Sequence, residues 1–153
     1  MLIDKGTDDG VKKDMGLLGP EGIVGVVINS SKKFAVAASI LNTNQRIAAQ
    51  LLSNNAQGSI VWRGENPLMS DFENIPLHIK VKVGDTVVTS GYNSVFPSNK
   101  LIGIVSDVNV ESHKLFQDIK VNLTTDFSTI RNVYAVRNVE KDTVNLLLDE
   151  VHE

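Results

Sequence analysis

The chain has 153 residues, 42% of them hydrophobic and 22% charged, which are ordinary values for a globular protein of one or two small domains. Its formal net charge is −3 and its lysines are scattered, so the composition argues against a nucleic-acid-binding protein. The absence of cysteine excludes disulfides, Cys-ligated zinc and thiol catalysis.

Short aliphatic and β-branched segments, separated by turn residues, run along most of the chain. The turns recur about every 8–12 residues, a spacing typical of an all-β barrel or sandwich. The longest apolar run, residues 23–28, is far shorter than the roughly 20 residues that span a bilayer. We expect strands at residues 2–3, 15–18, 23–29, 34–41, 46–51, 58–62, 86–90, 101–110, 116–123 and 133–137.

Two parts of the chain resemble each other. Residues 11–18 match residues 81–88 in pattern, and each segment leads through a turn to a strand with a glycine in its middle, Gly25 in the first and Gly103 in the second. A glycine within a strand marks a sharp bend or a close approach of two backbones, and small barrels need such bends to close. The repeat indicates two related barrels; chance similarity between hydrophobic strands is the alternative.

The segment from Gly84 to Gly91 is the clearest unit of turn and strand. Gly84 and Asp85 are typical turn residues, the next four residues favour a strand, and Gly91 lets the chain reverse. We therefore assign structural roles to Gly84, Asp85 and Gly91 in turns and to Gly25 and Gly103 at barrel corners.

Two aromatic residues, Tyr92 and Phe96, lie in the loop that follows this strand. Pro97 restricts the backbone and stiffens the same loop. Because aromatic loop residues are favoured interface anchors, Tyr92 and Phe96 are our candidate partner-binding residues. For Phe96 the alternative is that it plugs the end of its own barrel.

We predict an all-β fold of two small antiparallel barrels with little helix. Residues 1–55 form the first barrel and residues 56–123 form the second. The first stretch supplies too few strands, so we expect the strand at 133–137, within residues 124–140, to return and complete the first barrel. Residues 141–153 form a C-terminal tail or a short helix, since helical spacing relates Val144, Leu147, Leu148 and Val151.

No motif in the chain is typical of catalysis or of cofactor binding. The histidines His78, His113 and His152 have no histidine three or four residues away, as a metal site on a helix would need. The glycine-rich residues 19–25 lie between two strands and not at the start of a helix, where a phosphate would bind. We therefore expect no catalytic residue, no metal and no cofactor.

Two other function classes remain open at this stage. A trypsin-like hydrolase would need Ser90 with His78 or His113 and with Asp85 or Asp107, and only spatial geometry can decide that. The chain has no Gly-x-Ser-x-Gly motif. A generic β-barrel ligand-binding module would need one large apolar pocket.

Several segments recur in a characteristic order and spacing: residues 5–11, 22–27, 40–42, 58–64, 75–76, 84–91, 96–97 and 102–103. Together they resemble the bacterial cell-shape family MreC, and the resemblance extends to about residue 139. Residues 41–43 and 125–127 resemble the Bacteroidetes branch of that family.

The resemblance implies a non-enzymatic scaffold of the cell-elongation machinery with two barrels similar in topology to trypsin-like barrels. It implies a place on the periplasmic face of the inner membrane, anchored by an N-terminal transmembrane helix absent from these 153 residues. The implied partners are the elongation-specific penicillin-binding transpeptidase, MreD, the MreB system and further copies of the protein. We expect no nucleic-acid partner, and membrane contact only through segments missing from this fragment.

Overall fold

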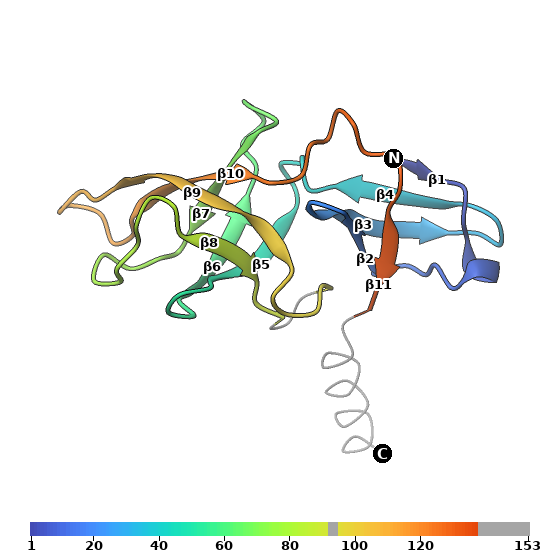
Figure 1. Ribbon diagram of the computed structural model, residues 1–153, viewed down its shortest axis with the longest axis horizontal. Coiled ribbons are helices and arrows are strands. Elements are labelled where there is room, and N and C mark those ends of the chain that lie inside the picture. Colours follow the sequence, from blue (N-terminus) through green and yellow to red (C-terminus); the bar gives the residue numbers. More distant parts are fainter. Residues whose placement is uncertain (92–94, 138–153) are drawn as a thin grey trace, which may run out of the picture.

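The protein is built almost entirely of β-strands in the computed structural model, which describes residues 1–91 and 95–137 (Figure 1). A single 3-10 turn, η1 (Thr7–Asp9), is the only helical element in these two stretches. The predicted all-β fold with little helix is therefore confirmed. The strands are β1 (Leu2–Ile3), β2 (Gly16–Gly19), β3 (Gly22–Ser30), β4 (Ala35–Ser39), β5 (Arg46–Leu51), β6 (Gln57–Val61), β7 (Met69–Glu73), β8 (Thr86–Thr89), β9 (Leu101–Asn109), β10 (Asp118–Leu123) and β11 (Tyr134–Val136).

The strands form two antiparallel sheets that lie side by side (Figure 1). Six strands close into a barrel in the order β10-β7-β6-β5-β8-β9. The other five form a sheet in the order β1-β4-β3-β2-β11, which we call the first sheet. Among the residues described, β1 and β11 are its two edges, so the first of the two predicted barrels is a curled sheet with an open side.

The domain boundary that we predicted at residue 55 is wrong for β5, which belongs to the closed barrel. Ala49 of β5 lies opposite Gly58 of β6 and, on its other side, opposite Thr89 of β8. The short aliphatic pattern of β5 suits either sheet, and long-range pairing decides between them. In contrast, β11 lies in the first sheet, where it pairs with β2 and Tyr134 lies opposite Leu18. The strand that we predicted at 133–137 therefore returns to the first sheet, although that sheet is open among the described residues.

The larger of two buried hydrophobic clusters is shared by the two sheets. Leu18 and Ile23 of the first sheet belong to the same buried cluster as Ile102 and Val105 of the barrel. The hydroxyl of Thr125, after the last barrel strand, donates a buried hydrogen bond of 2.9 Å to the carbonyl oxygen of Ile23. Burial of this continuous aliphatic cluster is the main stabilising term, and it joins the two sheets into one packed body.

The repeat that we predicted from the sequence appears in the structure as two three-stranded units with matching register. Strands β2-β3-β4 pair in the same way as strands β8-β9-β10. In both units the register of the first two strands slips by one residue just before the central glycine, Gly25 or Gly103. The register between the second and third strands slips three residues after the same glycine, at Ile28 in the first unit and at Ser106 in the second. Such β-bulges bend a strand, and here they curl both sheets at matching places.

The two central glycines are sites of close backbone contact. A Cβ atom at Gly25 would lie 2.3 Å from the carbonyl oxygen of Ala38, and one at Gly103 would lie 2.3 Å from that of Asn122. Both distances are far below van der Waals contact, and the opposing atoms are backbone that cannot rotate away. Only glycine fits at these two corners without moving the neighbouring strand.

Candidate partner-binding surfaces

Phe96 is a core residue and not a surface anchor, so this part of our partner-binding prediction is wrong. Its side chain is fully buried. Its ring covers Gly16 of β2, where an added Cβ would lie 2.6 Å from two ring carbons. Phe96 therefore packs onto the first sheet, and the alternative that it plugs the end of its barrel is closer to its observed position. Tyr92 lies outside the described residues.

The polar residues around β8 serve the loops that they join. Gly84 has a φ of +97°, which other residues adopt at a cost, and the Asp85 carboxylate accepts a 2.9 Å hydrogen bond from the backbone N–H of Lys82. Gly91 also has a positive φ, +73°. The buried Thr89 hydroxyl donates to the carbonyl oxygen of Pro97 at 2.6 Å and accepts from a backbone N–H at 2.9 Å. These contacts fix the loop that carries Phe96.

Two of the groups that a hydrolase would need, Asp85 and His113, are engaged in local structure. Asp85 caps its own turn. His113 is exposed in the β9–β10 hairpin, where its Nε2 lies 3.2 Å from a carboxylate oxygen of Glu111. In the part of the chain that the structure describes, no three His, Cys, Asp or Glu side chains are grouped to hold a metal ion.

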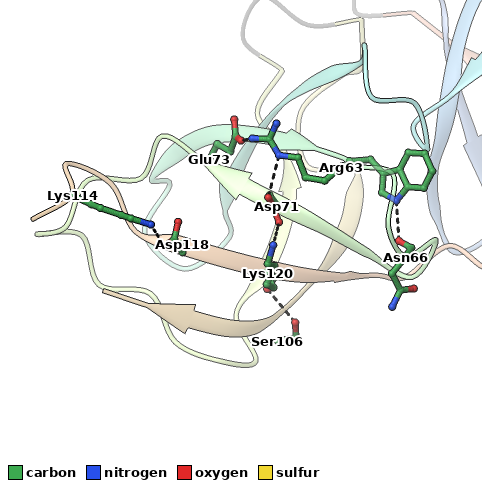
Figure 2. Close-up of polar contacts among 9 residues, drawn as sticks. Arg63, Asn66, Asp71, Glu73, Ser106, Lys114, Asp118 and Lys120 are labelled. Atoms are coloured by element: carbon green, nitrogen blue, oxygen red, sulfur yellow. Dashed lines mark hydrogen bonds and ion pairs between the residues drawn. The ribbon is translucent and has the colours of Figure 1, made fainter. Parts of the chain in front are cut away.

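A network of ion pairs covers the outer face of the barrel (Figure 2). Arg63, just after β6, contacts both Asp71 and Glu73 of β7, with 3.2 Å between its Nε and Asp71 Oδ2. Lys120 of β10 pairs with Asp71, and its backbone oxygen accepts a hydrogen bond from Ser106 of β9. Ion pairs this exposed contribute little to stability, but they keep this face hydrated.

The same network lines a hollow of about 380 Å³. Arg63, Asp71, Glu73 and Lys120 are among its walls, and these charges already neutralise one another. A pocket for a small molecule is normally apolar with a few convergent polar groups. The hollow therefore gives no support to the ligand-binding alternative.

The outer face of the first sheet is apolar instead. Leu2 of β1 lies opposite Val36 of β4, and their side chains are 71% and 42% exposed. Ile28, at the second bulge of β3, and Phe34, just before β4, are 46% and 51% exposed. We call these four residues the outer apolar face. Their neighbours in the same strands point inward, where Val27, Ala35 and Ala37 form a buried cluster.

The repeat allows this face to be compared with the barrel position by position. Val36 and Lys120 are equivalent, because each lies opposite the residue that follows the second bulge. Leu2 opposite Val36 then corresponds to Asp71 opposite Lys120. The bulged residues are Ile28 and Ser106. One face thus carries an ion pair where the other carries two exposed aliphatic side chains.

The β9–β10 hairpin is a second exposed apolar area. Leu115 is 82% exposed and Phe116 is 43% exposed. Both residues line a shallow depression that also contains Lys114 and Asp118, which form a 2.8 Å ion pair. Isolated exposed apolar residues are common on protein surfaces and need no partner, and this pair is confined to the tip of one hairpin. The extended outer apolar face is therefore the stronger candidate for binding.

Neither surface was identified by residue from the sequence, because the residues that we named as binding candidates, Tyr92 and Phe96, both lie in one loop. The alternation in β4 gave no sign of which side would be buried, because Ala35, Val36 and Ala37 are all apolar. The sequence did contain one clue to the outer apolar face: Leu2 and Val36 are apolar, whereas Asp71 and Lys120, at the equivalent positions of the other repeated unit, are charged. Using it required the strand register, which only the fold supplies.

Comparison with known proteins gives a consistent family. The family model described as rod shape-determining protein MreC, barrel core, matches residues 1–137. The cell shape-determining protein MreC of Listeria monocytogenes is 29% identical over 147 residues, covering 94% of this chain and 50% of that protein. MreC of Escherichia coli is 25% identical, covering 99% of this chain and 41% of that protein. The chain thus spans about half the length of the curated relatives it matches.

Solved structures agree with the fold. MreC of Listeria monocytogenes superposes with a TM-score of 0.83 at 28% identity, covering 90% of this chain and 67% of the other. MreC of Pseudomonas aeruginosa gives 0.82 at 27% identity, covering 88% and 86%. A Helicobacter pylori structure, titled as a complex between penicillin-binding protein PBP2 and MreC, gives 0.59 at 19% identity, which shows likeness of fold. Within the described residues, no helix has the length and apolar character to cross a membrane.

Proposed function

The chain belongs to the MreC family of rod shape-determining proteins, and from that premise we propose that it is a non-enzymatic scaffold of the bacterial cell-elongation machinery. Its task is to bind cell-wall synthesis proteins and so maintain cell shape. The first partner we propose is the elongation-specific penicillin-binding transpeptidase, because the Helicobacter pylori relative is titled as a complex with a penicillin-binding protein. MreD, the MreB system and further copies of the chain are additional proposed partners.

We place this activity on the periplasmic face of the inner membrane. We also propose that the protein is held there by an N-terminal membrane anchor; the chain covers about half the length of its curated relatives. The scaffold role needs no cofactor or metal. It is supported by the local structural use of the residues that a hydrolase would require, Asp85 and His113 in particular.

The outer apolar face is the observation that carries the proposal. Exposed apolar side chains gathered on one sheet mark interaction surfaces more often than isolated ones do. Leu2 and Val36 occupy positions that the barrel fills with Asp71 and Lys120, so the fold itself does not require them to be apolar. We propose that Leu2, Ile28, Phe34 and Val36 contact a protein partner. Tyr92 remains a candidate partner-binding residue.

The repeat suggests the variant that tests this surface. Replacing Leu2→Asp together with Val36→Lys copies the Asp71–Lys120 pair onto the equivalent positions of the first sheet. Both substituted side chains are exposed, so the fold should survive, and a thermal melt checks that it does. Loss of two anchors should weaken binding to the purified transpeptidase at least about tenfold, equivalent to about 1.4 kcal/mol.

Leu115→Ser is the matched control, because it removes a more exposed apolar side chain from a different surface. It should leave binding within about twofold of the unchanged protein. Equal binding by the double variant and the unchanged protein would place the interface elsewhere. Hydrolysis of peptides or esters that disappears in Ser90→Ala would refute the non-enzymatic role.

A further inference from the structure

One end of the first sheet, the end farthest from the barrel in Figure 1, carries five lysines. The loop after β1, the turn before β2 and the β3–β4 hairpin all lie at this end, because the strands are antiparallel. Hydrogen bonds hold these connections together: the N–H of Asp8 donates to the carbonyl oxygen of Lys32 at 3.1 Å, and the Ser30 hydroxyl donates to that of Val11 at 2.7 Å. The five side chains are exposed, and none forms an ion pair with another described residue: Lys5, Lys12, Lys13, Lys32 and Lys33.

The β3–β4 hairpin joins this positive charge to the outer apolar face. Lys32 and Lys33 directly precede Phe34, which belongs to that face. Residues 22–64 contain no aspartate or glutamate, so the charged side chains of the hairpin are all cationic. The acidic residues at the same end of the sheet lie in the other two connections: Asp4, Asp8, Asp9 and Asp14. A polypeptide that complements this surface is therefore apolar, with acidic side chains beside the hairpin.

The C-terminal segment, residues 138–153, has this composition. It lies outside the described residues, as does the tail or short helix that we predicted at 141–153. In sequence it carries five acidic residues and one lysine, a net charge of −4 with His152 neutral. Helical spacing places four of its apolar residues on one stripe: Val144, Leu147, Leu148 and Val151. A helix this short is marginal in water by itself, and burial of its apolar stripe on a surface stabilises it.

The last described strand directs the chain toward the lysines. β11 runs antiparallel to β2, and Val136 lies opposite Gly16, the first residue of β2. The chain therefore leaves β11 toward the end of the sheet that holds the turn before β2 and the β3–β4 hairpin. This turn continues alongside β3, since the N–H of Asp14 donates to the carbonyl oxygen of Val27 at 2.8 Å. The described chain thus ends close to the lysine-bearing turn.

The outer apolar face lies within reach and on the same side of the sheet. A row of residues that lie opposite one another crosses four strands: Val136, Gly16, Val26 and Ala38. Val36 is two residues from Ala38 in β4, so both side chains lie on the side to which Val136 points. β4 is three strand spacings from β11, or about 14 Å, whereas residues 137–143 span up to about 23 Å when extended. The stripe that begins at Val144 can therefore reach Val36.

We infer that the C-terminal segment folds back and docks on the outer apolar face. Its apolar stripe contacts Ile28, Phe34 and Val36. Its acidic side chains lie beside Lys32 and Lys33. The tether holds the segment near the face at an effective concentration on the order of millimolar, so contacts too weak to join separate molecules are sufficient.

Docking of the segment has a consequence for binding, and only this consequence rests on the proposed function. The proposed function places a protein partner on the same outer apolar face. The segment and the partner then exclude each other, and the partner has to displace the segment. The affinity of the partner is reduced by the fraction of molecules in which the face is covered.

A spin label on the C-terminal segment tests the docking in the 153-residue chain. The chain has no cysteine, so His152→Cys provides a single attachment site. We expect the label to broaden the amide signals of Phe34 and Val36 in NMR spectra and to leave that of Leu115, in the β9–β10 hairpin, unchanged. Leu147→Asp together with Leu148→Asp should abolish the broadening, because it puts charge into the apolar stripe. Absence of broadening, or broadening that persists in this double variant, would overturn the inference.

Reversal of the hairpin charge tests the second part of the contact. Lys32→Glu together with Lys33→Glu should reduce the broadening at Val36 at least about twofold, and a thermal melt checks that the variant is folded. The matched control is Lys80→Glu together with Lys82→Glu, which reverses the same charge on two exposed lysines of the barrel. The control should leave the broadening unchanged. An equal reduction in both variants would refute the placement of the acidic side chains beside the hairpin.

Two further measurements separate the inference from its alternatives. Labelled chain mixed with unlabelled, isotopically enriched chain should show no broadening; broadening there would identify docking between copies and refute the contact within one chain. The variant with Leu147→Asp and Leu148→Asp should bind the purified transpeptidase at least about threefold more tightly than the unchanged chain. Equal affinity, with the segment docked, would refute the competition and place the partner elsewhere. Absence of broadening with unchanged transpeptidase binding would refute the docking alone.

Discussion

Replacing Gly103 by alanine should destabilise the protein strongly for a steric reason. The added Cβ would lie 2.3 Å from the carbonyl oxygen of Asn122 and 2.6 Å from a methyl carbon of Val121. Ordinary contact begins near 3.4 Å, so β9 and β10 would have to separate by about 1 Å at this point. Overpacking of this kind typically costs about 1–3 kcal/mol, and the rigid backbone partner favours the upper end of that range. For a chain of this size, a loss of about 3 kcal/mol lowers the melting temperature by roughly 6–12 °C.

Thermal unfolding followed by circular dichroism measures this loss. Gly25→Ala should behave alike, because its Cβ would meet the carbonyl oxygen of Ala38 at the same 2.3 Å. Gly10→Ala is the control: Gly10 has a φ of +85° but no atom within 4 Å of the added Cβ, so it bears backbone strain without a clash. Its cost should be about 1–2 kcal/mol. If Gly103→Ala melts no lower than Gly10→Ala, the close-contact argument is wrong.

Two other predictions concern the core and a surface carboxylate. Phe96→Ala should lower the free energy of unfolding by about 3–5 kcal/mol in a urea titration, because it leaves a cavity next to Gly16 between the two sheets. A decrease of less than about 1 kcal/mol would contradict the assignment of Phe96 to the core. Ser128→Ala should raise the pKa of Asp126 in an NMR titration, because the Ser128 hydroxyl at 2.6 Å and its N–H at 3.0 Å hold that pKa below its ordinary value. The stabilisation of the folded state by this contact is present at pH values above the pKa of Asp126 in the unfolded chain, and it is lost as the pH falls through the pKa of Asp126 in the folded protein. An unchanged pKa of Asp126 in the variant would show that the contact is not formed.

Local patterns in the sequence predicted the parts of the fold that depend on local chemistry. The alternation of β10 and the turn residues around Gly84 indicated strands where strands occur. The mid-strand glycines indicated both corners, because few other features place glycine inside a strand. β7 was missed, since Ser70, Asp71 and Glu73 are poor strand formers and the segment depends on pairing with β6 and β10.

The features that local sequence patterns could not predict depend on contacts between residues far apart in the chain. β5 has neighbours on both sides within the barrel, and nothing in its own residues distinguishes that sheet from the other. The position of Phe96 depended on what lay above Gly16, a residue far away in the chain. The outer apolar face could be recognised only after the two sheets had been aligned by their bulges.

The contact of Phe96 with Gly16 has a mechanical consequence. Because this ring and the shared aliphatic core lie between the sheets, neither sheet can rotate against the other without opening a void in the core. The described part of the chain should therefore behave as one stiff body, with no hinge between its halves. A partner bound to the outer apolar face and a second partner bound to the far end of the barrel would therefore be held at a fixed distance and in a fixed relative orientation.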